Sequence, residues 1–167
     1  FRFDSALELL EHGLELAPAP DDSHRLLMLK GECTRETGHA ADSTAIYRAA
    51  LDVAENAPAR CRALIGLAAG MRVTDEFDDA FDALDQAQAI AEAESLHLEL
   101  SQVHYYRGNL YFPLGKIDGC LKEHELALAQ AQIAASPEDE ARALSGLGDA
   151  YYSRGRMISS LSYFRRC

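Results

Sequence analysis

Two histidines and a cysteine are the residues that come nearest, by type, to a metal-binding or pH-sensing site. His104, Cys120 and His124 combine imidazole nitrogens with a thiol, which are groups that bind zinc, and imidazole also titrates near neutral pH. Their spacing matches no metal motif, and no C-x-x-C pair occurs. We therefore interpret both histidines as core residues, and whether they do more stays open at this stage.

No other catalytic constellation stands out. Glu123 and Glu125 flank His124, but adjacent residues on a helix point in different directions. The chain has no glycine-rich phosphate loop, no H-E-x-x-H and no G-x-S-x-G. The sequence therefore predicts a protein that is not an enzyme and that has no cofactor.

Arginines at repeated positions offer a different chemistry, the recognition of carboxylates. Arg25, Arg62 and Arg142 occupy one column of an internal repeat, and guanidinium groups present forked donors that suit carboxylates. They belong to a chain of net charge −11, which argues against nucleic acid as a partner. We therefore expect binding of a protein or peptide.

The repeat behind these columns has a constant spacing. A small residue is followed seven positions later by Gly or Asp, and five positions after that by another small residue. Successive copies step by 37, 40 and 40 residues, which is typical of helical solenoids. The copies are Gly31–Gly38–Ser43, Ala68–Asp75–Ala80, Gly108–Gly115–Cys120 and Gly148–Gly155–Ser160.

The columns predict how the helices end and pack. Gly38, Gly115 and Gly155 follow helical segments and suit a left-handed turn, and Asp75 tolerates that conformation better than most residues. Small columns indicate close helix crossings, because larger side chains would overpack them. Cys120 and Cys167 fall in such columns, so we expect both thiols to be buried and reduced.

This pattern resembles the tetratricopeptide repeat (TPR) family, although that family's usual period is about 34 residues. The first helices would carry Leu27–Gly31, Leu64–Ala68–Met71, Gly108–Tyr111 and Leu144–Gly148–Tyr151. The resemblance implies an all-α, right-handed superhelix, or α-solenoid, of antiparallel helix hairpins. It also implies that the first helices line a concave groove.

We expect a single repeat domain over residues 1–167, cut from a longer protein. It would comprise a partial repeat over 1–20 and repeats over about 22–57, 58–94, 96–135 and 137–167. The predicted helices cover roughly 4–16, 22–37, 41–56, 59–73, 77–93, 96–112, 117–134, 137–153 and 157–167. Asp22 and Ser23 are candidate caps for the second helix, and Ser136 precedes Pro137 as the cap of the eighth.

The resemblance places a partner-binding groove on the inward positions of the first helices. An acidic or carboxylate-ended peptide would suit its arginines, with aromatic residues as apolar anchors. Related arrays use an asparagine in the column of Asn109 to hold a peptide backbone or terminal carboxylate. Alternatively, the arginines pair with acids of neighbouring repeats and hold the superhelix. The groove residues are Arg25, Glu32, Arg35, Arg62, Arg72, Gln102, Tyr105, Asn109, Phe112, Arg142, Asp149 and Tyr152.

The third and fourth copies look like the TPR tails of multidomain bacterial signalling proteins of the nucleotide-cyclase and NTPase type. This implies a cytoplasmic sensor or partner-docking segment without a membrane span. One alternative is a structural spacer, or self-association through the repeat ends at Phe1, Phe3, Phe164 and Cys167. A weaker alternative is a small-ligand groove near Tyr105, Tyr106 and Phe112.

Overall fold

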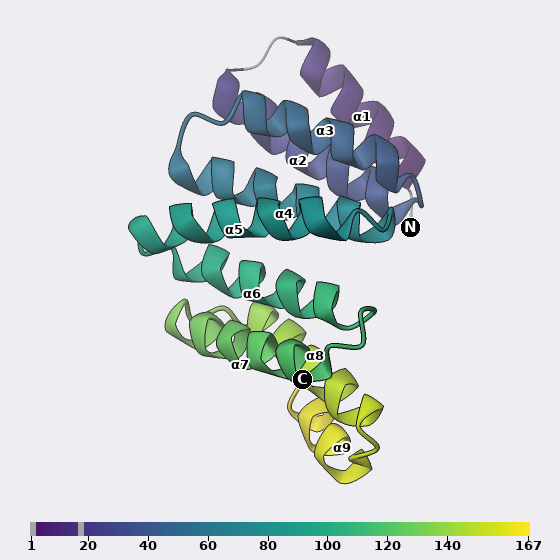
Figure 1. Cartoon of the computed structure of the whole chain (residues 1–167). Coiled ribbons are helices and arrows are strands. Elements are labelled where there is room, and N and C mark those ends of the chain that lie inside the picture. Colours follow the sequence, from purple (N-terminus) through teal and green to yellow (C-terminus); the bar gives the residue numbers. More distant parts are fainter. Residues whose placement is uncertain (1–2, 17–18) are drawn as a thin grey trace. The chain divides into compact units, whose positions relative to one another are not determined.

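The computed structural model describes residues 3–16 and 19–167, and these residues form nine helices and no strands (Figure 1). The helices are α1 (Phe3–Glu15), α2 (Pro20–Glu36), α3 (Ala40–Asp52), α4 (Ala57–Val73), α5 (Phe77–Ala93), α6 (His97–Tyr111), α7 (Ile117–Ile133), α8 (Pro137–Ser153) and α9 (Met157–Arg166). From α2 onward, consecutive helices are joined by short connections.

The repeat spacing correctly marks the turns between paired helices. Gly38, Gly115 and Gly155 have φ values of 89°, 68° and 71°, and Asp75 takes the same left-handed conformation at 61°. Glycine reaches this region without steric cost, and an acid replaces it in the second copy. The fold class and the helix count are therefore confirmed for the described residues.

The predicted N-cap residue is found at the start of α8 but not at the start of α2. Ser136 Oγ accepts a hydrogen bond from the backbone N–H of Asp139, and Pro137 occupies the first helical turn. The prediction that Asp22 or Ser23 caps the second helix is wrong. That helix begins earlier, at Pro20, with Ala19 at the N-cap position and no side-chain cap, because proline's fixed φ already suits a first turn.

The chain divides into two compact units, one ending at Ile90 and the other beginning at Ala91. In the first unit, α2 packs against α1, α3 and α4, and α3 also packs against α4. In the second unit, α7 lies between α6 and α8, and α8 also packs against α9. Each unit thus repeats the same helix-hairpin packing.

Aromatic rings lying against glycines hold neighbouring helices together in both units. The Tyr47 ring on α3 lies against Gly31 of α2 and Gly66 of α4, so close that a Cβ on either glycine would fall within 3 Å of the ring. His124 on α7 lies in the same way between Gly108 of α6 and Gly146 of α8. Missing Cβ atoms therefore let these rings pack directly on helix backbones.

Of the two cysteines in the small-residue columns, which were predicted to be buried, one is buried and one is exposed. Cys120 is fully buried, and burial raises the pKa of its thiol to about 11, so it stays protonated at neutral pH. The prediction that Cys167 is buried is wrong. Its Sγ donates to the carbonyl of Ala141, but the residue is exposed because α9 is covered only on the side that packs against α8.

Candidate binding surface

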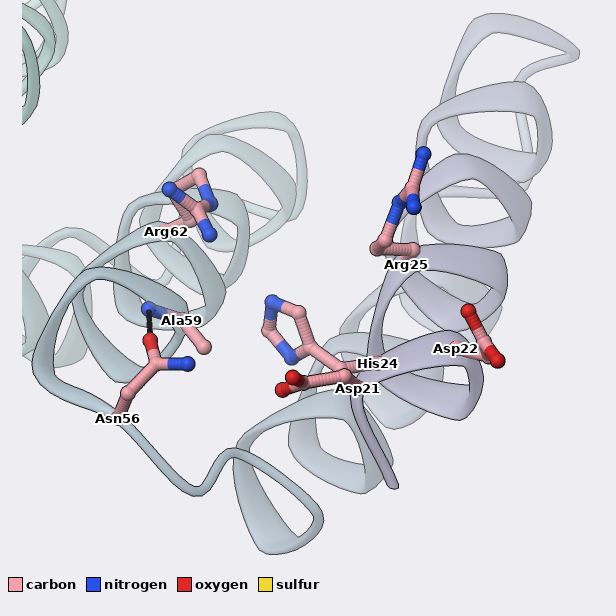
Figure 2. Close-up of a pocket in the computed structure, with 7 residues that line it drawn as sticks. All are labelled: Asp21, Asp22, His24, Arg25, Asn56, Ala59 and Arg62. Carbon is pink, nitrogen blue, oxygen red and sulfur yellow. Dashed lines mark hydrogen bonds between the residues drawn. The ribbon is translucent and has the colours of Figure 1, made fainter. Parts of the chain in front are cut away.

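A pocket of about 340 Å³ lies in the first unit, between the N-terminal turns of α2 and α4. Its lining includes Arg25 from α2 and Arg62 from α4, which are predicted groove residues of one repeat column (Figure 2). Both arginines are exposed, and each comes from the first helix of its repeat. The lining residues are Asp21, Asp22, His24, Arg25, Asn56, Ala59 and Arg62.

His24 lines this pocket with a buried ring that is only 3% exposed. Its Nδ1 lies 3.0 Å from the carbonyl oxygen of Ala50 on α3. Because a carbonyl can only accept, Nδ1 carries the hydrogen and donates it. Nε2 is buried, and the described part of the chain offers it no hydrogen-bond partner. Figure 2 shows the ring projecting into the space between α2 and α4.

The bond made by His24 recurs along the chain. Cys61 Sγ donates to the carbonyl of Ala87 at 3.4 Å, and Ser101 Oγ donates to that of Ala127 at 2.9 Å. Both bonds span 26 residues, as does the bond from His24 to Ala50. Each ties a first helix to the small-residue column of its own second helix. The second and third copies therefore use a small donor where the first copy has imidazole.

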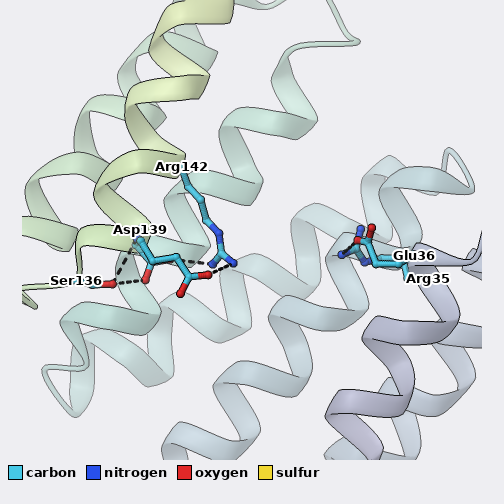
Figure 3. A network of polar contacts seen from close by, with 6 residues as sticks. Arg35, Glu36, Ser136, Asp139 and Arg142 are labelled. Atoms are coloured by element: carbon cyan, nitrogen blue, oxygen red, sulfur yellow. Dashed lines mark hydrogen bonds and ion pairs between the residues drawn. The ribbon is translucent and has the colours of Figure 1, made fainter. Parts of the chain in front are cut away.

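The other predicted groove residues of the first unit lie outside the pocket that Arg25 and Arg62 line. The Arg35 guanidinium lies 2.6 Å from the carboxylate of its neighbour Glu36 (Figure 3), and Glu32 is exposed. Arg72 is half-buried, and its Nε has no hydrogen-bond partner within the described ranges. None of these three residues lines the pocket that Arg25 and Arg62 share.

In the second unit, three of the predicted groove residues are aromatic. The half-buried Tyr105 ring contacts Tyr106 edge-on, with centroids 5.2 Å apart, and lies 5.6 Å from the ring of His124. Phe112 and Tyr152 are 41% and 61% exposed, which leaves most of the Tyr152 ring available to a partner. The polar residues Gln102 and Asn109 are half-buried, and Asp149 is exposed.

Arg142 pairs within its own helix. Its guanidinium donates to Glu138 at 2.6 Å and to Asp139 at 3.2 Å, and Ser136 also donates to the Asp139 carboxylate (Figure 3). Like the pair between Arg35 and Glu36, these contacts stay inside a single repeat. The ion pairs of Arg142 thus lie within its own helix.

The two histidines first considered for metal binding have different surroundings. His104 Nδ1 lies 2.7 Å from the carboxylate of Glu123, while His124 is almost completely buried. Burial lowers the pKa of His124 to about 4, although the nearby Glu123 partly opposes this. The residues that the structure describes contain no cluster of three or more potential metal ligands.

Sequence reasoning missed His24 as a pocket residue, and with it Asn56. Asn56 caps α4 by accepting from the N–H of Ala59 at 2.9 Å, so its side-chain amide remains as a donor beside the pocket. One available signal was the column that joins His24 to Cys61 and Ser101, in which a histidine is unusually large.

Comparison with known proteins supports the fold. No family model and no curated protein matches the chain. Among solved structures, BtubC (BKLC) from P. vanneervenii aligns with a TM-score of 0.75 at 17% identity, covering 99% of this chain and 70% of that one. MamA aligns at 0.60 and 21% identity, covering 98% and 85% of the two chains. A Podosopora anserina putative kinesin light chain with nearly identical TPR-like repeats aligns at 0.65 and 14% identity, covering 99% and 85%.

The chain has a TPR-like α-solenoid fold. At these identities, the similarity concerns the fold alone. Among the described residues of this TPR-like chain, no helix has the length and the apolar composition of a membrane span.

Proposed function

We propose that this TPR-like chain is a non-enzymatic interaction scaffold whose first helices bind an acidic protein segment. The observation that carries the proposal is the pocket that Arg25 and Arg62 both line, each from the first helix of its repeat. Two guanidinium groups line the pocket beside two helix N-termini, where helix dipoles place partial positive charge, and they offset Asp21 and Asp22 of the same lining. The proposed partner is thus an acidic or carboxylate-ended peptide.

Aromatic residues of the second unit are proposed as a separate set of apolar contacts for a partner. Tyr152 and Phe112 are exposed, and exposed aromatic residues are frequent energetic centres of protein interfaces. Asn109 and Gln102 add amide groups that can bond to a peptide backbone. We further propose that the scaffold is cytoplasmic and serves a larger bacterial signalling protein, the setting implied by the resemblance of its third and fourth copies.

Reversing the charge of the two arginines tests this function. We expect Arg25→Glu combined with Arg62→Glu to weaken binding of labelled acidic peptides by about tenfold or more, since losing one good charge contact costs about 1.4 kcal/mol or more. Fluorescence anisotropy measures the affinity, and circular dichroism checks that helicity is unchanged. Arg60→Glu is the matched control, because Arg60 is an exposed arginine of α4 outside the pocket. Equal weakening by the control, or none by the double variant, would refute the proposal.

A second candidate function is self-association, which the exposed apolar face of α9 favours. Ile158 is 89% exposed, and Met157, Leu161 and Phe164 are between 42% and 52% exposed. Phe3 is half-buried, whereas Phe1, also invoked for this function, lies outside the described residues. Apolar patches of this kind promote association. If α9 mediates it, the mass measured by light scattering rises with concentration, and Ile158→Glu keeps the chain monomeric. A wild-type chain that stays monomeric excludes this function.

A further inference from the structure

The Phe164 ring of α9 is more exposed than the equivalent rings of α3 and α7. Tyr47 and His124, which occupy the same repeat column, each lie between glycines of two helices and are 4% and 1% exposed. Phe164 lies against Gly148 of α8 and is 42% exposed. Its outer side therefore corresponds to a surface that a helix covers in both α3 and α7.

The neighbouring positions of α9 differ from their equivalents in the same way. Leu161 is 50% exposed, whereas Thr44 of α3 and Leu121 of α7 are 4% and 7% exposed. Met157, one turn before Leu161, is 52% exposed. Spacings of four and three residues place these side chains and the Phe164 ring on one side of the helix. We call Met157, Leu161 and Phe164 the Phe164 face.

On α3, the equivalent face is covered by two small residues of α4. A Cβ on Gly66 would fall within 3 Å of the Tyr47 ring, and one on Gly70 would fall 2.9 Å from Thr44 Oγ1. The missing side chains therefore let the α4 backbone lie directly on α3. Because Gly70 follows Gly66 while Thr44 precedes Tyr47, the two helices run antiparallel.

On α7, the equivalent face is covered by α8 in the same way. A Cβ on Gly146 would also fall within 3 Å of the His124 ring, and Ala150 belongs to a buried cluster with Leu121. A ring in this column is thus met by a glycine, and a second small residue follows one turn later. Larger residues would overpack both contacts. The Phe164 face therefore fits a helix with a glycine and a second small residue four positions apart.

The segment that carries the Phe164 face is basic. Residues 154–167 contain four arginines and no acidic residue, although the whole chain has a net charge of −11. Arg154 pairs with Asp118 of α7, whereas Arg156 and Arg165 are exposed at the two ends of α9. Complementary charge favours an acidic helix as the partner.

A second copy of this chain does not offer such a helix freely. Within the described helices, a glycine followed four residues later by another small residue occurs in α4 and α8 alone. Both pairs are already buried against α3 and α7. A second copy could therefore present this pattern only by opening its own core, so the fitting partner is a different protein.

We propose that the Phe164 face binds an acidic amphipathic helix of another protein. The helix runs antiparallel to α9, with a glycine against Phe164 and a small residue against Leu161. Its acidic side chains pair with the exposed arginines at the ends of α9. This inference is independent of acidic-segment binding at Arg25 and Arg62, because those residues belong to the first unit.

Two peptides taken from this chain serve as probes, because they share the small-residue pattern and differ in charge. Pro137–Ser153 contains four acidic residues and one arginine, whereas Ala57–Val73 contains three arginines and no acidic residue. A lactam bridge keeps each peptide helical, since free peptides of this length are marginal helices. We expect the acidic peptide to bind the full chain about tenfold more tightly than the basic one, measured by fluorescence anisotropy.

Matched substitutions locate the contact. Gly146→Leu in the acidic peptide should weaken binding about tenfold or more, by overpacking against Phe164. Leu161→Glu in the chain should weaken binding as much, and circular dichroism checks that its helicity is unchanged. Ile158→Glu is the control, because it adds the same charge to α9 at a position that is also exposed in α7, where the residue is Asp118. Its affinity for the peptide should equal that of the wild type.

Several results would overturn the inference. They are absence of acidic-peptide binding, equal affinity of the two peptides, and equal effects of Leu161→Glu and Ile158→Glu. Binding that survives Leu161→Glu but is lost in the Arg25→Glu and Arg62→Glu double variant would place the peptide in the pocket, which overturns this inference and supports the proposed function. A wild-type chain that self-associates in light scattering, and that excess peptide does not dissociate, would assign the Phe164 face to a second copy instead.

Discussion

Acidification from pH 7 to below pH 4 is expected to remove about 3 kcal/mol of stability through His124 alone. Burial lowers the pKa of His124 to about 4, whereas an unfolded histidine titrates near 6.5. Between these values, the unfolded chain binds a proton that the folded chain does not. Protonation therefore stabilises the unfolded state relative to the folded state as the pH falls through 6.5. The loss of folding stability is complete below pH 4. Urea unfolding at several pH values, followed by circular dichroism, measures it.

His124→Phe isolates this contribution from that of the carboxylates, which also titrate in acid. Phe164 occupies the same repeat column and likewise lies against a glycine, Gly148, so a phenyl ring suits the site. The variant should lose about 3 kcal/mol less than the wild type between pH 7 and pH 4. If both proteins lose the same stability over that interval, His124 is not the titrating group.

The repeat spacing predicted most of the fold, because it marks positions where backbone geometry restricts the residue type. Gly38, Gly115, Gly155 and Asp75 predicted the left-handed turns, and all four adopt positive φ. Ser95 and Ala135 take the same conformation, at φ 55° and 52°, although neither residue type indicates it. Local backbone hydrogen bonds end the helix there, from Leu96 N–H to the carbonyl of Ala91 and from Ser136 N–H to that of Ala131. Those turns therefore could not be predicted from residue type.

The binding surface was harder to predict, because its chemistry depends on pairing in three dimensions. Column position correctly grouped Arg25 with Arg62, which share a pocket. It could not show that Arg142 bonds to acids of its own helix. Nor could it single out His24, whose role depends on a carbonyl 26 residues further along the chain. Spacing thus identifies faces of helices, whereas the partners of polar atoms appear only in the folded chain.

Gly66→Ala should destabilise the first unit by about 2 kcal/mol, even though alanine is the better helix former. An alanine Cβ would lie 2.5 Å from Cδ1 and Cε1 of the Tyr47 ring, well inside van der Waals contact. The ring cannot slide away, because Gly31 of α2 lies against it as well, and Tyr47 is only 4% exposed. Overpacking therefore outweighs the gain in helix propensity, and urea unfolding at pH 7 measures the difference.

The same substitution at Gly13 is the matched control. A Cβ there would meet the mobile end of Leu26 at 3.3 Å, so Gly13→Ala should be neutral or should gain up to about 1 kcal/mol from helix propensity. Adding Tyr47→Leu to Gly66→Ala should recover part of the loss, because Leu84 occupies the equivalent column in the next repeat. A Gly66→Ala variant as stable as the wild type would mean that the close approach of ring and helix does not hold α2, α3 and α4 together.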